Sequence, residues 1–471
     1  MILEALRREA AAALRSPVRI AALVAFLTAS ALALFAGHGF RAEWTESLHT
    51  AEAQQAESVD SVREWFTTGE VGPADMPWVD IHQARWMDSY AGTRIGREPA
   101  PLAGIATGSV DDSPRVARVT RGSDPFSDEG AKIENPELGS TETIDLIFVL
   151  AVLIPLLIGA MGVGCGSMER ESGIDRLIAV QRGRASDWFL AQSAAIFCVV
   201  AVAVQAVVLA AAVTMGAFGT DGLLLALVAL LYTALWSGIL TATAVAARSL
   251  REATLSYGGV WVLLVILAPA LQSELAFSKV ADDPGLQGAL DTRKEQYETY
   301  DTDLPLLVDE LYRARPELVS MPLGFLDEVP RSATRHVYDW HRLQITTDKH
   351  RRSLLAEREA DFGAMASMAW SPASTLTLAA ERLAGRDLTA AMEFRTRVML
   401  EITERMDWVL DATWGQEPLG EADFDELLTG TPKSMLPSSG GIAMHVFVLL
   451  AWAAVAWSIG VVRVRRREPG S

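Results

Sequence analysis

Six long runs of apolar residues divide the chain, separated by polar stretches of very different lengths. The runs lie at 20–37, 146–163, 189–218, 223–247, 255–271 and 442–462. Each has, or nearly has, the roughly 20 residues that a helix needs to cross the hydrocarbon core of a membrane. A buried core helix is the alternative interpretation of any single run, and 255–271, with Pro269 near its end, is the weakest candidate. Together the runs predict an all-α membrane protein with six transmembrane helices.

The polar stretches complete the expected organisation of the chain. Residues 1–17 carry an apolar stripe opposite Arg7, Arg8 and Arg15, which predicts an amphipathic helix on the membrane surface. We expect spans at 18–37, 144–164, 188–218, 222–247, 254–272 and 441–463. Two mainly helical extracytoplasmic segments at 38–143 and 273–440, an inner loop at 165–187 and a tail at 464–471 make up the rest.

The distribution of arginine predicts the orientation of the spans. If both termini are cytoplasmic, the short inner segments 1–19, 164–187, 248–254 and 463–471 hold fourteen Arg and no Lys. This is the positive-inside pattern of a multi-pass protein of the cell membrane. The outer segments are acidic, with 9 basic and 19 acidic residues in 38–143 and 18 and 30 in 274–440. Such acidity argues against nucleic acid as a partner and is typical of a solvated surface.

The outer segments predict helices around one irregular region. Apolar residues at near-helical spacing in 43–66 indicate that the first span continues outward as a stalk. Frequent Gly and Pro in 71–143 predict a loop-rich or partly disordered region. In the second segment, Ser371 and Asp387 are expected to cap two helices that pair in antiparallel fashion around Gly385. Methionines 392, 399 and 406 of the second helix are expected in its core.

Motifs for catalysis, metal binding and nucleotide binding do not occur in the sequence. None of the five lysines follows a glycine, as the lysine of a phosphate-binding P-loop does. Histidines 336, 341 and 350 are too irregularly spaced to share one helical face, so we expect a solvated helix there and no metal site. Buried charges, which ion-coupled transporters need, are nearly missing from the spans. The sequence therefore predicts neither an enzyme nor a secondary transporter.

The inner loop from Met168 to Phe189 carries the clearest functional signal. Its sequence, MERESGIDRLIAVQRGRASDWF, is held at the membrane face by an apolar run on each side. Ile174, Leu177 and Ile178 form a small apolar stripe at helical spacing, and the arginines of the loop can pair with carboxylates of a partner. Two interpretations follow from these residues: a solvated connection between spans, or a platform on which a soluble partner pushes.

Two motifs resemble one family. Glu169-Arg170-Glu171-Ser172-Gly173, followed by Leu177-Ile178 and a basic turn, resembles the inner loop of ABC-2 type permeases, although Ile174-Asp175 departs from the family pattern. The outer sequence SPASTLTLAAERLAGRDLTAAMEFR resembles a subfamily whose large extracytoplasmic domain has no assigned function. The resemblance implies that a separate ABC ATPase subunit docks on the inner loop. The implied coupling residues are Glu169, Arg170, Glu171, Gly173, Ile174, Arg176, Leu177, Ile178, Arg182 and Arg184.

The resulting hypothesis is a permease subunit of an ATP-driven ABC-2 type transporter. The resemblance implies export, a second permease chain of the same or a related kind, and ATP and Mg bound in the partner ATPase, with no cofactor in this chain. Membrane lipid is the remaining expected partner. The alternative is a membrane-anchored receptor or assembly factor whose outer segments bind a ligand or partner without transport.

Overall fold

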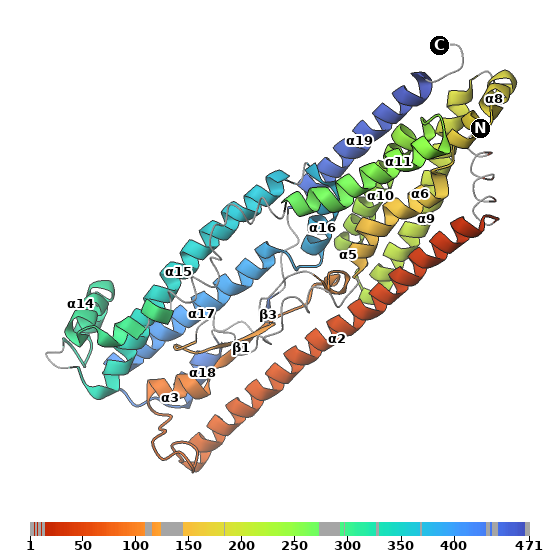
Figure 1. Cartoon of the computed structure of the whole chain (residues 1–471). Coiled ribbons are helices and arrows are strands. Elements are labelled where there is room, and N and C mark those ends of the chain that lie inside the picture. The colour runs from red at the N-terminus through yellow and green to blue at the C-terminus, as the bar shows by residue number, and fades with distance from the viewer. Residues whose placement is uncertain are drawn as a thin grey trace.

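The computed structural model of the chain is an elongated, mostly helical molecule (Figure 1). Both termini lie at the same end of it, and we name this the inner end, following the predicted orientation. The described residues are 4, 7, 11, 15–108, 115–123, 145–182, 184–272, 293–295, 297–325, 329–367, 370–429, 434–435 and 441–466. Most of the expected interfacial helix at 1–17 lies outside these residues, as do 467–471 of the expected tail.

Six helical segments of the described chain are long and apolar enough to span a membrane, as predicted. The first is the inner part of α2 (Pro17–Thr68), and the third and sixth are α9 (Ala185–Met215) and α19 (Ala443–Arg466). The second joins α5 (Leu146–Phe148), η2 (Val149–Leu153), α6 (Ile154–Gly162) and α7 (Ser167–Glu171). The fourth joins α10 (Thr220–Leu240) to η3 (Thr241–Val245), and the fifth joins α11 (Leu250–Trp261) to η4 (Val262–Leu267). The chain is thus a multi-pass membrane protein.

Tyrosine hydroxyls satisfy backbone groups at the proline of the second span. Pro155 has no N–H, so the carbonyl of Ala151, one turn earlier, lacks its helical donor, and the helix passes through a π-helical turn just before the proline. The buried Tyr232 of α10 donates its hydroxyl to that carbonyl at 2.7 Å. Tyr257 of α11 donates to the carbonyl of Pro155 itself at 2.6 Å. In a membrane core, where water is absent, such substitutes keep a proline-containing span viable.

Helix α16 (Pro372–Leu383) is part of the membrane bundle. Ser371 caps it as predicted, and its apolar face packs mainly against α10 and α19. The Ser371 hydroxyl also donates to the carbonyl of Leu264 in the fifth span, at 3.2 Å. The expected antiparallel pair is therefore wrong: α17 (Leu388–Gly415) is capped by Asp387 as predicted, but packs mainly against α15 (Arg331–Ser367). The apolar face of α16 finds its partner in the spans.

The outer region consists of helices around two further apolar cores (Figure 1). Helix α2 continues as one rod of 52 residues from the first span to Gly69, which confirms the predicted stalk. Helices α15 and α17 run beside each other, and Met399 and Met406 are buried in their core, as expected. The smaller elements are α3 (Ala84–Tyr90), η1 (Ala103–Ile105), η5 (Thr299–Asp301), α14 (Leu304–Ala314), η6 (Pro316–Ser320) and α18 (Glu421–Thr429).

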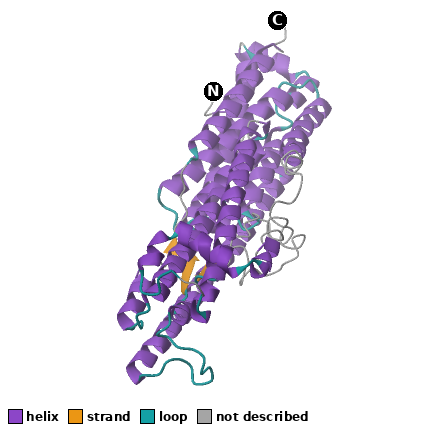
Figure 2. Ribbon diagram, turned by 90° about the vertical axis from the view of Figure 1, so that its left-hand side faces the viewer, coloured by secondary structure: helices purple, strands orange, loops and turns teal. Residues whose placement is uncertain are grey.

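A small sheet corrects the all-α prediction. Strand β1 (Thr93–Arg97) pairs with β2 (Val116–Val119) in antiparallel fashion and with β3 (Ser434–Met435) in parallel, in the order β2-β1-β3. Figure 2 shows the strands flanked by helices at the outer end. Strands this short, set among Gly and Pro, leave no period-2 signal in the sequence. The sheet joins the first outer segment to the second.

The described parts of 71–143 are packed, which corrects the expectation of a loose segment. Residues 71–108 and 115–123 are rich in loops, as predicted, but Ile81, Met87 and Leu102 are completely buried. These side chains pack into cores that α2, α16 and α17 help to form. These loops are rich in Gly and Pro, and the burial of their apolar side chains against neighbouring helices holds them in place. The rest of 71–143 lies outside the described residues.

Buried charges connect the two outer segments. Asp88 of α3 is completely buried. Its carboxylate forms ion pairs with the guanidinium of Arg405 in α17, at 3.2 Å, and with that of Arg121, just after β2, at 3.3 Å. Arg121 also reaches the nearly buried Asp339 of α15, at 3.4 Å. Because removing one partner of a buried pair leaves an uncompensated charge, these contacts fix how the segments pack.

Candidate coupling site at the inner end of the bundle

Two glycines shape the inner loop where the second span ends. Gly166 and Gly173 both have positive φ, 74° and 75°, a conformation that side chains disfavour. Gly166 precedes α7, and Gly173 lies between α7 and α8 (Ile174–Arg182). The Glu169 carboxylate accepts the Gly166 N–H at 2.8 Å, which caps the first turn of α7. The chain therefore turns sharply and places α8 beside α9 at the inner end (Figure 1).

Arg170 ties the loop to the end of the fourth span. Its guanidinium donates to the carbonyl of Val245 and, at 3.1 Å, to that of Ala247. It also lies 4.7 Å from the centre of the Phe189 ring in α9. The carbonyls at a helix C-terminus lack helical donors and carry partial negative charge, so a cation is the favoured partner there.

Glu171 makes the complementary contact with the fifth span. Its carboxylate accepts the N–H of Leu250, the first residue of α11, at 3.0 Å. An anion is favoured at a helix N-terminus because its first N–H groups are unpaired. Three successive side chains, Glu169, Arg170 and Glu171, therefore hold the inner ends of the second, fourth and fifth spans together. All three contact backbone groups of this chain, and their expected role in coupling to a partner stays a prediction.

Helix α8 exposes apolar side chains. Ile174 is 49%, Leu177 57% and Val180 84% exposed, while Ile178 packs against the core of the bundle. The predicted stripe is thus split: Ile174 and Leu177 point outward and Ile178 points inward. Sequence reasoning missed Val180, although its spacing of three residues from Leu177 could have indicated it. Exposed apolar residues on one short helix are typical of a contact surface for another protein or for the membrane.

The arginines of the loop are the other predicted coupling residues. Arg176 and Arg184 are exposed, so they remain accessible to carboxylates of a partner. Arg182 ends α8, and its side chain lies outside the described residues. Gly173 contributes its backbone conformation, and its N–H donates to the carbonyl of Arg170 at 3.1 Å. Of the predicted coupling residues, six are therefore exposed: Glu171, Gly173, Ile174, Arg176, Leu177 and Arg184.

The three outer histidines are not solvated as expected. His336 and His350 are buried, and His341 contacts Glu310 at 3.2 Å. Burial and the nearby guanidinium groups of Arg121, Arg85 and Arg335 lower the pKa of His336 to about 3, and burial lowers that of His350 to about 4. Among the residues that the structure describes, no group of three or more His, Cys, Asp or Glu could hold a metal ion.

Comparison with known proteins finds no relative in which this site could be compared. No family model matches the chain, and no curated protein or solved structure matches it. The resemblance of the inner loop to ABC-2 type permeases therefore stays a prediction that rests on the residues themselves.

Proposed function

We propose that the chain is the membrane-spanning permease subunit of an ATP-driven ABC-2 type transporter, coupled to a separate ATPase subunit through α7 and α8. The observation that carries the proposal is the outward apolar face of α8, formed by Ile174, Leu177 and Val180, at the inner end of a six-span bundle. A soluble partner would bury these side chains and pair with Arg176 and Arg184. ATP and Mg would be bound in that partner.

The contacts of Arg170 and Glu171 provide a route for force. A push on α8 would reach the fourth span through the guanidinium at Val245 and the fifth span through the carboxylate at Leu250. Because one loop holds the ends of several spans, they would tilt together rather than separately. The direction of transport implied by the family resemblance is export.

The spans also leave apolar surface for a second permease chain. In the most apolar window of the first span only 22% of residues are buried within the chain, and in the fifth only 11%, against 67% in the second. Lipid or a second chain of the same or a related kind would cover these faces. A pair of permeases with two ATPases follows from the proposal.

Copurification tests the proposal. The full chain would be solubilised from its native membrane, and its partner chains identified by mass spectrometry. We expect an ABC ATPase subunit, and we expect Ile174→Ser with Leu177→Ser to reduce its recovery at least tenfold. A matched control is Val71→Ser with Trp78→Ser, which changes two exposed apolar residues of the outer region. Full recovery with the α8 variant would contradict the coupling assignment.

Charge reversal at Glu169 and Glu171 is a poor test of docking. These carboxylates accept backbone N–H groups of Gly166 and Leu250, so reversal would disturb the loop as well as any partner contact. The apolar α8 variant avoids this ambiguity because its side chains are exposed.

The alternative of a receptor or assembly factor is favoured by one observation, a large cavity in the outer region. The same copurification separates the two functions. Recovery of a sensor or secretion component, with no ATPase subunit, would favour the alternative.

A further inference from the structure

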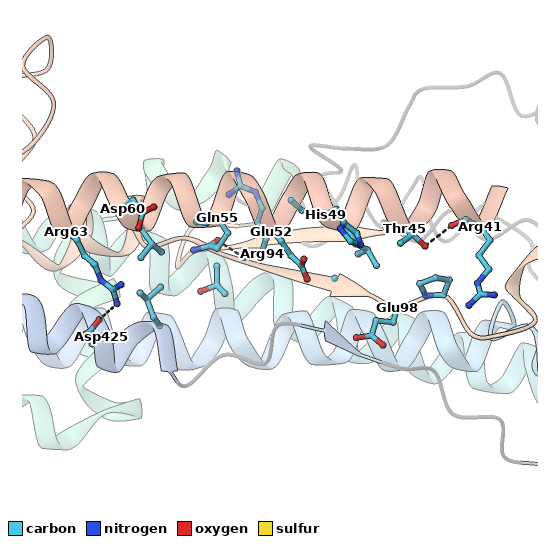
Figure 3. A pocket seen from close by; sticks show the side chains of 18 residues that line it. Arg41, Thr45, His49, Glu52, Gln55, Asp60, Arg63, Arg94, Glu98 and Asp425 are labelled. Carbon is cyan, nitrogen blue, oxygen red and sulfur yellow. Dashed lines mark hydrogen bonds and ion pairs between the residues drawn. The ribbon is translucent and has the colours of Figure 1, made fainter. Parts of the chain in front are cut away.

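A long cavity of about 1280 Å³ runs beside the stalk in the outer region. One wall is α2 from Arg41 to Arg63, and the opposite side is formed by β1, the loop after it and α18 (Figure 3). We name this cavity the stalk groove. Arg41, at one end, donates to the carbonyl of Met215 at the outer end of the third span, so the groove begins beside the membrane bundle.

The length of the stalk groove suits an extended chain. Arg63 lies 22 positions after Arg41 on α2, which corresponds to roughly 33 Å at 1.5 Å per residue. An extended peptide of about ten residues covers that length at roughly 3.3 Å per residue. A compact small molecule would occupy only part of the groove.

Strand β1 lines the groove with Thr93, Arg94 and Gly96. Strand β2 pairs with β1 from Thr93 to Gly96, whereas β3 pairs with its other edge only at Gly96 and Arg97. On that edge the N–H of Arg94 donates to the side-chain amide oxygen of Gln55 in α2, at 3.1 Å (Figure 3). The amide nitrogen of Gln55 is buried and has no hydrogen-bond partner within the described part of the chain. A side-chain amide has the hydrogen-bonding chemistry of a peptide group, so the edge suits the main chain of an extended segment.

The available charge in the groove is negative. Arg63 pairs with Asp425 at 2.9 Å, Arg41 contacts the Met215 carbonyl, and Arg94 has partners of its own. Glu52 and Asp60 line the groove and form no ion pair with any residue that the structure describes. They lie eight residues apart on α2, or about 12 Å, close to the roughly 13 Å between positions i and i+4 of an extended chain.

We propose that the stalk groove binds an extended, basic peptide segment of another protein, whose cationic side chains meet Glu52 and Asp60 and whose main chain meets the edge of β1 near Arg94. This proposal is independent of the ATPase coupling proposed above, because it uses only outer residues. It assigns a binding role to the outer domain whether or not the chain transports a substrate.

Fluorescence anisotropy with the purified full chain in lipid-free detergent tests the proposal. The probe is a fluorescein-labelled decapeptide of alternating lysine and valine, compared with the glutamate–valine peptide and with the basic peptide N-methylated at alternate residues. We expect the basic peptide to bind, and each of the other two to bind at least tenfold more weakly. N-methylation keeps the charges but removes main-chain donors, so it isolates the contribution of the strand edge.

Matched variants locate the binding site. Glu52→Gln with Asp60→Asn should weaken binding of the basic peptide at least tenfold, and because both residues are exposed the fold should be kept. Glu46→Gln with Glu57→Gln removes the same charge from exposed positions of α2 outside the groove and should leave binding unchanged. Absence of binding, equal weakening by both double variants, or equal binding of the N-methylated peptide would overturn the proposal. Displacement of the peptide by added phosphatidylcholine with no difference between the variants would assign the groove to lipid instead.

Discussion

The two ends of the molecule use charged side chains in opposite ways. At the inner end, Arg170 and Glu171 contact backbone groups at span termini, and apolar side chains of α8 face outward. In the outer region, Asp88 and Arg405 pair with each other inside the packed structure. Charged side chains at helix ends can position a short loop without a core around it. A buried ion pair is different, because removal of one partner leaves an uncompensated charge in the interior. We therefore expect the outer region to tolerate polar substitutions in its interior far less than the loop tolerates changes on its surface.

The largest effect is expected from a substitution that breaks the buried ion pairs of Asp88. Asp88→Ala leaves Arg405 and Arg121 without their shared carboxylate in a buried site, and we expect a loss of about 3–5 kcal/mol in the stability of the outer region. Thermal unfolding of the purified chain and amide exchange of α3 and α17 measure it. Asp425→Ala, which breaks the exposed ion pair with Arg63, is the control and should leave the unfolding temperature nearly unchanged. A similar loss of stability in both variants would show that breaking the buried ion pair costs no more than breaking the exposed one.

The second prediction uses pH to reach the same region. The pKa of His336 is about 3 in the folded protein, below the ordinary value of 6.5. As pH falls below 6.5, the unfolded chain takes up a proton that the folded chain does not, so stability falls until the pH reaches about 3. Between pH 7 and pH 5 we expect a loss on the order of 2 kcal/mol from this residue.

The measurement is the unfolding temperature as a function of pH. His336→Gln should reduce the fall of the unfolding temperature at acid pH. Part of the remaining fall comes from His350, whose pKa is also lowered, to about 4. His341→Gln is the matched control, since His341 is only partly buried beside Glu310. An unaltered pH profile in His336→Gln would contradict the burial of a neutral imidazole.

Local signals in the sequence predicted where helices lie better than they predicted which helices pack together. The apolar runs predicted the six spans because the membrane requires one composition over about 20 residues. Ser371 and Asp387 predicted two helix starts because capping involves residues only three apart. The partner of α16 could not be predicted, because an apolar stripe of Leu and Ala fits a neighbouring helix and a membrane bundle equally well. The pairing of Asp88 with Arg405, 317 positions away, leaves no local pattern either.

At the inner site the sequence indicated a charged loop but not the contacts that its charges make within the chain. Charged residues between two spans look like a solvated surface, and periodicity alone does not reveal that Glu171 accepts the N–H of Leu250, 79 positions later. Ile178 belongs to the predicted stripe but packs against the core of the bundle, and α8 contacts α9. Rotation of a short helix is decided by tertiary packing, which the spacing of three residues cannot fix.

The smallest expected effect lies at the inner end. Arg170→Ala removes the donor to the Val245 and Ala247 carbonyls at the end of the fourth span, and we expect a local loss of only about 1 kcal/mol, the typical net contribution of a hydrogen bond. Amide exchange should rise roughly fivefold in 245–250 while that of the outer helices stays unchanged. Val180→Ser, at a position that is 84% exposed, is the control and should change stability by less than about 0.5 kcal/mol. If Arg170→Ala instead lowered the unfolding temperature as much as Asp88→Ala, the loop would be part of a cooperative core, and the contrast between the two ends of the molecule would be wrong.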